Sequence, residues 1–205
     1  MSGNRRTPVG LLPGEMKRKA IHLSTFLIPL IYLDHRVTRK EMTLGLALAM
    51  LLLVILEVVR LRARVFRIFF HHLLGDQLRR RERRDMLGGT YLVLGFLLSV
   101  LAFPPVVAVA ACEFLVLGDT AAALVGKSIG RIRAFDKTLE GSLACFLVCA
   151  AVGWALSAMH PAQLPLPVAL AGAFVATIFE ILPVPVDDNL KIPLSAGLVM
   201  HFLLP

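Results

Sequence analysis

Hydrophobic residues in this chain gather into long runs that short polar and basic stretches separate. Seven runs have roughly the length that a helix needs to cross a membrane core, about 20 residues. They cover residues 18–34, 42–59, 87–103, 105–125, 141–158, 165–183 and 190–204. The pattern predicts an all-α, polytopic membrane helical bundle of about seven transmembrane helices, with a tilted or partly inserted first and last run. Without an internal repeat or a low-complexity linker, residues 1–205 are expected to form one domain.

Composition supports a membrane protein. The chain is 57% hydrophobic with a mean hydropathy of +0.76, more apolar surface than a soluble domain of 205 residues can bury. Its formal net charge of +8 does not indicate nucleic-acid binding, because the cations cluster between the apolar runs. The basic N-terminus lacks a small-residue cleavage site after its first apolar run, so we expect it to be retained. The three cysteines lie in apolar runs and are expected to be small buried side chains.

The distribution of Lys and Arg predicts the orientation. With a cytoplasmic N-terminus, 19 of the 22 cations fall on the cytoplasmic side, as the positive-inside rule requires. This orientation places the loop 126–140 and residues 187–189 on the same face as the N-terminal cations. Residues 60–86 combine apolar positions at helical spacing with many arginines, which is typical of a basic amphipathic helix on the inner leaflet.

Acidic residues within apolar runs are candidates for function, because ionisable groups are costly inside a membrane. Glu57 lies three residues before Arg60, which fits a helix-end ion pair as well as a site. Glu113 either forms a hydrogen bond within the bundle or lies near a substrate head group. Glu180 lies near the inner end of its run, before Pro183, and is a possible substrate-site residue.

Asp119 is the strongest candidate acid. It follows Gly118 and precedes a run of small residues, which allows a ligand or another helix to approach the backbone. Asp187 and Asp188 add two carboxylates after the sixth run. Since Mg²⁺ takes oxygen ligands, usually one or two carboxylates together with substrate phosphates, Asp119 with one of this pair predicts a divalent-cation site. Two helix caps in a solvated loop are the alternative.

Small and basic residues follow Asp119. Gly126-Lys127-Ser128 resembles part of a P-loop, but the required glycine is absent at position 121 and no strand precedes it. Backbone amides and nearby cations still suit a di- or triphosphate. The cations of this loop are Lys127, Arg131 and Lys137, and Thr138, Glu140 and Ser142 lie where the next run begins.

The first run begins with a second cluster of polar residues. Arg18, Lys19 and His22 lie three or four residues apart and therefore share one side of a helix. His22 is a structural histidine at the membrane boundary or a functional one.

With these residues, the chain resembles the family of polyprenol (dolichol) kinases, phytol kinases and CTP-dependent diacylglycerol kinases. Four blocks carry the match and occur in the expected order: 18–22, 118–123, 126–142 and 187–190. A weaker match is Glu82 with Gly88-Gly89-Thr90-Tyr91.

The resemblance implies transfer of the γ-phosphoryl of CTP to the hydroxyl of a membrane lipid alcohol at the cytoplasmic face, with Mg²⁺ or another divalent cation. It also implies residue roles. Asp119, Asp187 and Asp188 are the implied metal ligands or catalytic acids, and Glu140 is an implied orienting residue of the catalytic site. His22 is a catalytic candidate from its position beside two cations. The implied phosphate-binding residues are Arg18, Lys127 and Lys137, and Asn189 is an implied orienting residue of the nucleotide site. From the residues themselves, further nucleotide-binding candidates are Lys19, Gly126, Arg131, Thr138 and Ser142. Asp119 and His22 are both candidates to accept the hydroxyl proton.

The central block also resembles CDP-diacylglycerol synthases, which would transfer a cytidylyl group to phosphatidic acid. The chain departs from that family at Leu139, where a tryptophan is usual, at residues 134–136, and in lacking a His-Gly-Gly block. A small transporter is a more distant alternative, because the acids gather near one face and no half of the chain is repeated. The sequence leaves the lipid alcohol and the oligomeric state open.

Overall fold

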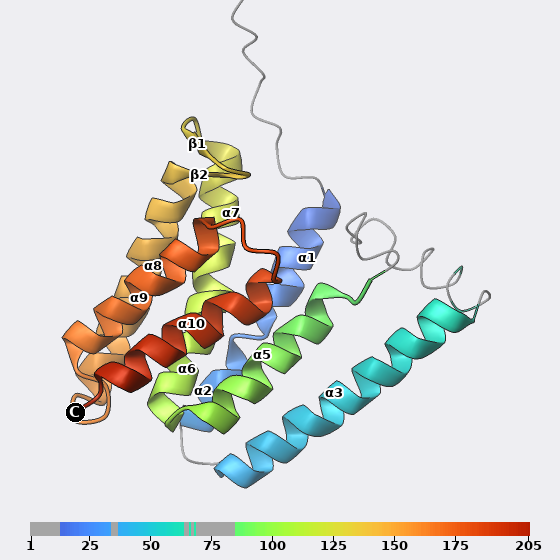
Figure 1. The fold of residues 1–205 in the computed structure, drawn as a ribbon, viewed down its shortest axis with the longest axis horizontal. Helices are drawn as coiled ribbons and strands as arrows, with labels where there is room; N and C mark the ends of the chain where they lie inside the picture. Colours follow the sequence, from blue (N-terminus) through green and yellow to red (C-terminus); the bar gives the residue numbers. More distant parts are fainter. Residues whose placement is uncertain (1–12, 34–36, 64–65, 67, 69–84) are drawn as a thin grey trace, which may run out of the picture.

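The computed structural model describes residues 13–33, 37–63, 66, 68 and 85–205. Within them the regular secondary structure is helical except for one short hairpin (Figure 1), so the prediction of an α-helical protein is confirmed. The helices are α1 (Pro13–Ser24), α2 (Leu27–Leu33), α3 (Arg39–Arg62), α5 (Gly88–Ala102), α6 (Pro105–Glu113), the π-helix η1 (Phe114–Gly118), α7 (Asp119–Ser128), α8 (Leu139–Met159), α9 (Leu166–Ile181) and α10 (Asp188–Leu203).

Among the described residues, three helical segments are long and apolar enough to cross a membrane. They are α3, α8 and the continuous segment Pro105–Ser128, which comprises α6, η1 and α7. The shorter helices α5 and α9 are also apolar. The first predicted run, 18–34, is divided by a turn between α1 and α2, because the Thr25 and Phe26 amides bond to carbonyls three residues back instead of continuing an α-helix.

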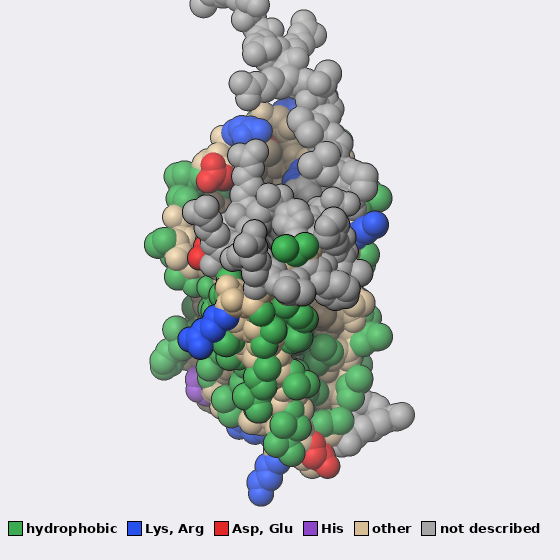
Figure 2. Space-filling view, turned by 90° about the vertical axis from the view of Figure 1, so that its right-hand side faces the viewer, with side chains coloured by type: hydrophobic (Ala, Val, Ile, Leu, Met, Phe, Trp, Pro, Cys, Tyr) green, Lys and Arg blue, Asp and Glu red, His purple; other side chains and the backbone are tan. Residues whose placement is uncertain are grey.

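The segment Pro105–Ser128 forms the centre of the bundle. In its most apolar window 78% of residues are buried, against 17% in α3, which lies at the edge beside α5 (Figure 1). Helices α8, α9 and α10 pack in succession against one another and against the central segment. Figure 2, which faces the side on which α3 lies, shows a broad hydrophobic area with most charged side chains at its margins. The exposed leucines of α3 therefore suit contact with lipid tails.

Local sequence signals set the helix ends. Thr38 and Glu41 form a capping box at the start of α3, in which the Glu41 carboxylate accepts a 2.8 Å bond from the Thr38 amide. At the other end of α3, Glu57 is buried and accepts bonds from Arg60 Nε at 2.9 Å and from the Leu87 amide at 2.6 Å. Glu57 therefore forms the helix-end ion pair that its spacing allowed, and it also ties α3 to the start of α5.

Two further predictions concern residues 60–86 and the cysteines. The predicted amphipathic helix lies mostly outside the described residues, which include only the end of α3 at Arg62, a few residues after it, and Asp85–Met86.

All three cysteines are free and buried, as predicted. Cys145 and Cys149 lie against Gly118 in η1, where an added Cβ would come within 2.5 Å of the Cys149 Sγ. Only glycine allows α8 to approach the π-helix so closely.

Candidate functional site

A short hairpin connects α7 to α8 and brings Lys137 into the bundle. Its strands β1 (Arg133–Ala134) and β2 (Lys137–Thr138) are antiparallel, and Phe135 at the turn has a positive φ of 56°. A loop is predicted here from the sequence, whereas the structure forms two short strands within it. A two-residue connection of this kind reverses the chain tightly and returns it to the start of α8.

Glu140 and Thr138 hold the hairpin in place. The Glu140 carboxylate accepts bonds from the backbone amides of Arg131, at 2.9 Å, and Ile132, at 3.1 Å. Thr138 caps α8 by accepting a 3.2 Å bond from the Gly141 amide. Its hydroxyl lies so close to Gly126 that an added Cβ there would come within 2.7 Å. The end of α7 and the start of α8 are therefore packed together around Thr138.

Lys19 of α1 forms an ion pair with Asp119 at the start of α7. The ammonium also donates to the backbone carbonyl of Asp119 at 3.1 Å, and both side chains are largely buried. These residues are 100 positions apart in the chain. The structure thus joins the N-terminal cluster to the acid that the sequence analysis placed at the centre of the site.

His22 lies one turn after Lys19 and interacts electrostatically with Asp119. The imidazole forms a hydrogen bond with the Leu115 carbonyl, and Nε2 is buried without a partner among the described residues. A hydrogen bond to the Leu115 carbonyl requires a proton on Nδ1, so a neutral imidazole at this position would carry its lone pair on Nε2. His22 belongs to the site by position.

Lys137 lies between carboxylates from two helices. Its ammonium is 2.8 Å from Glu180 Oε1 in α9 and 3.0 Å from Asp188 Oδ2 in α10. Burial alone lowers the pKa of Lys137. The neighbouring carboxylates, Asp188 first and then Glu180 and Asp119, outweigh burial, so the pKa of Lys137 is raised. Ser142 completes the cluster by donating a 2.9 Å bond to Glu180 Oε2.

Lys191 is a member of this cluster that sequence reasoning missed. It is buried, lies 2.8 Å from Asp188 Oδ1, and donates a 2.9 Å bond to the Leu182 carbonyl at the end of α9. A lysine three residues after an aspartate within an apolar run was the available signal. Asp188 therefore accepts from two ammonium groups, Lys137 and Lys191.

The adjacent acid, Asp187, has a different role. Its Oδ1 caps α10, accepting from the Asn189 amide at 3.1 Å and from Asn189 Nδ2 at 2.8 Å. Asn189 Nδ2 also lies 3.1 Å from the Gly88 carbonyl, which connects α10 to the start of α5. Asp188 thus contacts Lys137 and Lys191, and Asp187 caps α10.

The other predicted residues lie around this cluster or apart from it. Arg18 and Lys127 are half-buried, and the Arg131 side chain is exposed beside Glu140. Glu113 is 2% exposed, and both its carboxylate oxygens lack a hydrogen-bond partner among the described residues. The interpretation of Glu113 as a hydrogen-bonding group within the bundle finds no such bond there.

The predicted metal ligands do not form a ready-made cage. Among the described residues, no three His, Cys, Asp or Glu side chains lie together in a group that could hold a metal ion. Asp119 is paired with Lys19, and Asp188 with Lys137 and Lys191. Because Asp119 and Asp188 both interact with Lys137, two carboxylates and several cations meet at this end of the bundle. Such an arrangement suits a polyphosphate held by lysines with a carboxylate-bound divalent cation.

Comparison with known proteins adds a second line of evidence. The chain is 29% identical over 143 residues to CTP-dependent diacylglycerol kinase 1 of Saccharomyces cerevisiae, a match that covers 68% of this chain and 49% of the yeast protein. It is 27% identical over 213 aligned positions to the protein of the same name from Eremothecium gossypii, covering 93% of this chain and 67% of that protein. An uncharacterized protein of Rickettsia prowazekii is 27% identical over 186 residues, covering 88% of this chain and 90% of its own length.

The chain thus spans about half the length of the yeast relative. No protein-family model matches the chain, and no solved structure matches it.

Proposed function

From the premise that this chain is a relative of CTP-dependent lipid kinases, we propose that it transfers the γ-phosphoryl of CTP to the hydroxyl of a membrane lipid alcohol. The observation that carries the proposal is the pairing of Lys19 with Asp119 beside Lys137. At one end of the helical bundle, this arrangement places two ammonium groups that can bind phosphates. Beside them it places a carboxylate that can bind a divalent metal ion or accept the proton of a hydroxyl group. Phosphoryl transfer depends mostly on such positioning and charge neutralisation.

The lysines are the proposed phosphate ligands. In the structure Lys19 and Lys137 are bound to carboxylates, so CTP competes with those carboxylates for the ammonium groups. Lys127 lies at the end of α7, and its side chain with the nearby backbone amides completes the proposed phosphate site. Arg18 and Arg131 contribute positive charge at its margins. Glu140 and Thr138 act indirectly, by holding the hairpin that carries Lys137.

Asp119 and Asp188 are the proposed ligands of a divalent cation. Mg²⁺ commonly binds one or two protein carboxylates together with substrate phosphates, so these two carboxylates, which both interact with Lys137, are a sufficient protein contribution. When bound, the cation would neutralise charge that develops on the phosphates. Asp187 is assigned to capping α10, because its oxygen is already bonded to Asn189.

The reaction forms one bond and breaks one. The oxygen of the lipid hydroxyl attacks the γ-phosphorus, the bond from that phosphorus to the β-bridging oxygen breaks, and CDP leaves. We assign the hydroxyl proton to His22, because its Nε2 carries a lone pair without a partner among the described residues. Asp119, which is bound to Lys19, is the weaker base of the two candidates.

The membrane setting completes the proposal. The predicted seven-span topology rests on the apolar runs. The cytoplasmic location of the site rests on the distribution of Lys and Arg, and it would place the site on the side where CTP is available. Diacylglycerol is the first lipid alcohol to test, since two of the relatives are named CTP-dependent diacylglycerol kinases. Polyprenol, dolichol and phytol remain alternatives from the sequence resemblance.

The test uses purified protein, Mg²⁺ and CTP labelled separately at the α- and γ-phosphates. Diacylglycerol, polyprenol, phytol and phosphatidic acid are offered in parallel. Transfer of γ-label to an alcohol supports the kinase and identifies the acceptor. Transfer of α-label to phosphatidic acid with release of pyrophosphate would instead show a cytidylyltransferase, and transfer of neither label would refute both enzymes.

A further inference from the structure

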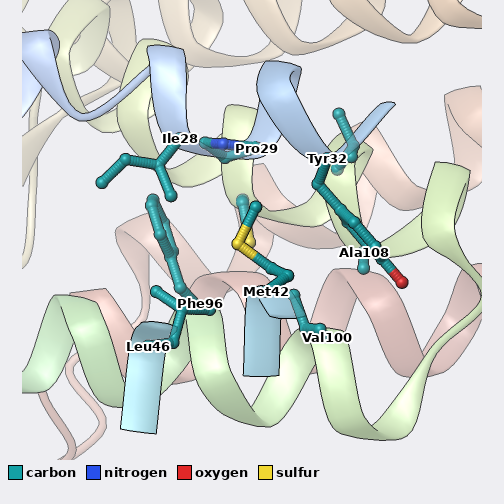
Figure 3. Close-up of a pocket in the computed structure, with 10 residues that line it drawn as sticks. Ile28, Pro29, Tyr32, Met42, Leu46, Phe96, Val100 and Ala108 are labelled. Carbon is teal, nitrogen blue, oxygen red and sulfur yellow. The ribbon is translucent and has the colours of Figure 1, made fainter. Parts of the chain in front are cut away.

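A small crevice in the bundle shares no residue with the site. It is lined mostly by apolar side chains of α2, α3, α5 and α6, among them Ile28, Met42 and Phe96 (Figure 3). Its free volume is about 10 Å³, which leaves room for about one water molecule. The groups that arrange a substrate are therefore to be sought in the charged cluster around Asp188, where Lys191 has no role assigned so far.

Lys191 lies at the start of α10 and connects that helix to the end of α9. Its ammonium is 2.8 Å from Asp188 Oδ1 and donates a 2.9 Å bond to the carbonyl of Leu182, the C-cap of α9. A cation near the N-terminus of its own helix is unfavourable for the helix dipole, whereas a cation at the C-terminus of another helix is favourable. The bond to Leu182 and the pairing with Asp188 thus account for a buried lysine at this position.

Asp188 accepts from two lysines that are held differently. The Lys137 side chain is 28% exposed, and its ammonium contacts two carboxylates, Asp188 Oδ2 at 3.0 Å and Glu180 Oε1 at 2.8 Å. The Lys191 side chain is 7% exposed, and its second partner is a backbone carbonyl at a helix end. Because water already reaches Lys137, a phosphate can compete there with the carboxylates. Lys137 is therefore the lysine that can turn to a ligand, and Lys191 is the one that stays.

The charges of this cluster are matched. Two ammonium groups, those of Lys137 and Lys191, face two carboxylates, those of Glu180 and Asp188. When Lys137 turns to a phosphate, Lys191 still compensates the charge of Asp188. Without Lys191, the same movement would leave both carboxylates without either lysine, and removing the partner of a buried charge is strongly unfavourable. Lys191 thus lowers the free energy needed to release Lys137.

We propose that Lys191 is a positioning residue for nucleotide binding. It holds Asp188 through Oδ1, so that Oδ2 is available to a divalent cation once Lys137 has turned to a nucleotide phosphate. This inference rests on the proposed function for the identity of the nucleotide and for the role of Asp188. Lys191 does not itself touch the phosphates, because its ammonium is enclosed between Asp188 and Leu182.

The variant Lys191→Met removes the charge and keeps a side chain of similar shape. Calorimetric binding of CTP with Mg²⁺ to the full chain in detergent, without a lipid substrate, reports its effect apart from turnover. We expect the dissociation constant for CTP to rise about 10- to 100-fold, the usual effect of losing a group that orients a metal ligand. In turnover assays, the CTP concentration for half-maximal rate should rise by a larger factor than kcat falls.

The control is Lys40→Met, which removes an exposed cation at the start of α3 and should bind CTP like the wild type. If Lys191→Met also binds CTP like the wild type, the positioning role is wrong.

The variant Asp188→Asn distinguishes positioning from a purely structural role. If Lys191 acts through Asp188, adding Lys191→Met to Asp188→Asn should change the dissociation constant for CTP by less than about twofold. A loss of the same size in the wild-type and Asp188→Asn backgrounds would show that Lys191 only joins α9 to α10, and it would overturn the proposal.

Acetylation of the wild-type protein gives the answer if Lys191→Met does not fold. The full chain is treated with acetic anhydride, with and without CTP and Mg²⁺, and the modified lysines are identified by mass spectrometry. We expect CTP to protect Lys137, and Lys191 to stay unmodified in both states. Modification of Lys191 that CTP suppresses would make it a phosphate ligand, and bound CTP that leaves Lys137 reactive would contradict its release; either result overturns the proposal.

Failure of this inference is distinct from failure of the proposed function. If the wild type binds no CTP and transfers no phosphoryl group, the proposed function is wrong, and this inference is wrong with it. If the wild type binds CTP and phosphorylates an alcohol while Lys191→Met behaves identically, only the role of Lys191 is wrong.

Discussion

Replacing Lys137 with methionine separates its structural from its catalytic contribution. Its ammonium is the partner of Glu180, whose side chain is 3% exposed, and of Asp188, which retains Lys191. Lys137→Met therefore leaves Glu180 as a buried carboxylate that still accepts a hydrogen bond from the Ser142 hydroxyl. A second variant, Lys137→Met with Glu180→Gln, removes that charge and keeps an oxygen for Ser142 to donate to.

The expected magnitude follows from burial. Removing one partner of a buried ion pair costs about 3–5 kcal/mol, because the remaining charge is uncompensated. The Lys137 side chain is 28% exposed, so water reaches part of the pair and the cost should lie near the lower limit, about 3 kcal/mol. The double variant should recover most of this loss. If Lys137 also binds phosphate, both variants should lose about 100- to 1,000-fold in turnover, the usual effect of removing one donor to transition-state charge.

The assay combines thermal unfolding in detergent with turnover at several CTP concentrations. Arg133→Met is the control, since it removes a cation from the exposed position on the other strand of the hairpin. An unchanged unfolding midpoint in Lys137→Met would refute the reasoning on the buried charge. Wild-type turnover in the double variant would show that Lys137 serves only to balance Glu180.

Three further predictions use the same measurements. Asp119→Asn should lose at least about 1,000-fold in turnover while the protein stays folded, because the neutral amide cannot balance the charge of a divalent metal ion or of Lys19. Near-normal activity in this variant would remove Asp119 from the mechanism. Lys127→Ala should mainly raise the CTP concentration needed for half-maximal turnover, and an unchanged CTP dependence would mean that the phosphate site is wrongly placed. Gly118→Ala should lower the unfolding midpoint, because the added Cβ would lie 2.5 Å from the Cys149 Sγ. The control Gly45→Ala, whose Cβ would have no neighbouring heavy atom within 4 Å, should be neutral or stabilising. Equal midpoints in the two variants would contradict the close packing at the π-helix.

The comparisons confirm the resemblance to CTP-dependent lipid kinases that the sequence blocks indicated. The relation to CDP-diacylglycerol synthases and the roles of individual site residues stay predictions. Among the structural predictions, the helix-end pair of Glu57 with Arg60 was readable from the sequence because its two members are one turn apart. The hairpin at residues 133–138 was not, since its two-residue strands are too short to show a periodic pattern.

The sequence by itself determined the helices. In an apolar environment backbone groups must bond within their own segment, so long hydrophobic runs specify helices without reference to the rest of the chain. The N-terminal cap of α8 at Thr138 is local in the same sense.

The contacts of the site were decided only by the tertiary structure. Lys19 meets Asp119 across 100 residues, and Lys137 meets Asp188 across 51, in both cases between different helices or strands. Spacing along one helix cannot predict such pairs, because they depend on which helices pack together and at what depth. The physical reason that these pairs form is the cost of a buried charge, which each ammonium and carboxylate reduces by contact with the other.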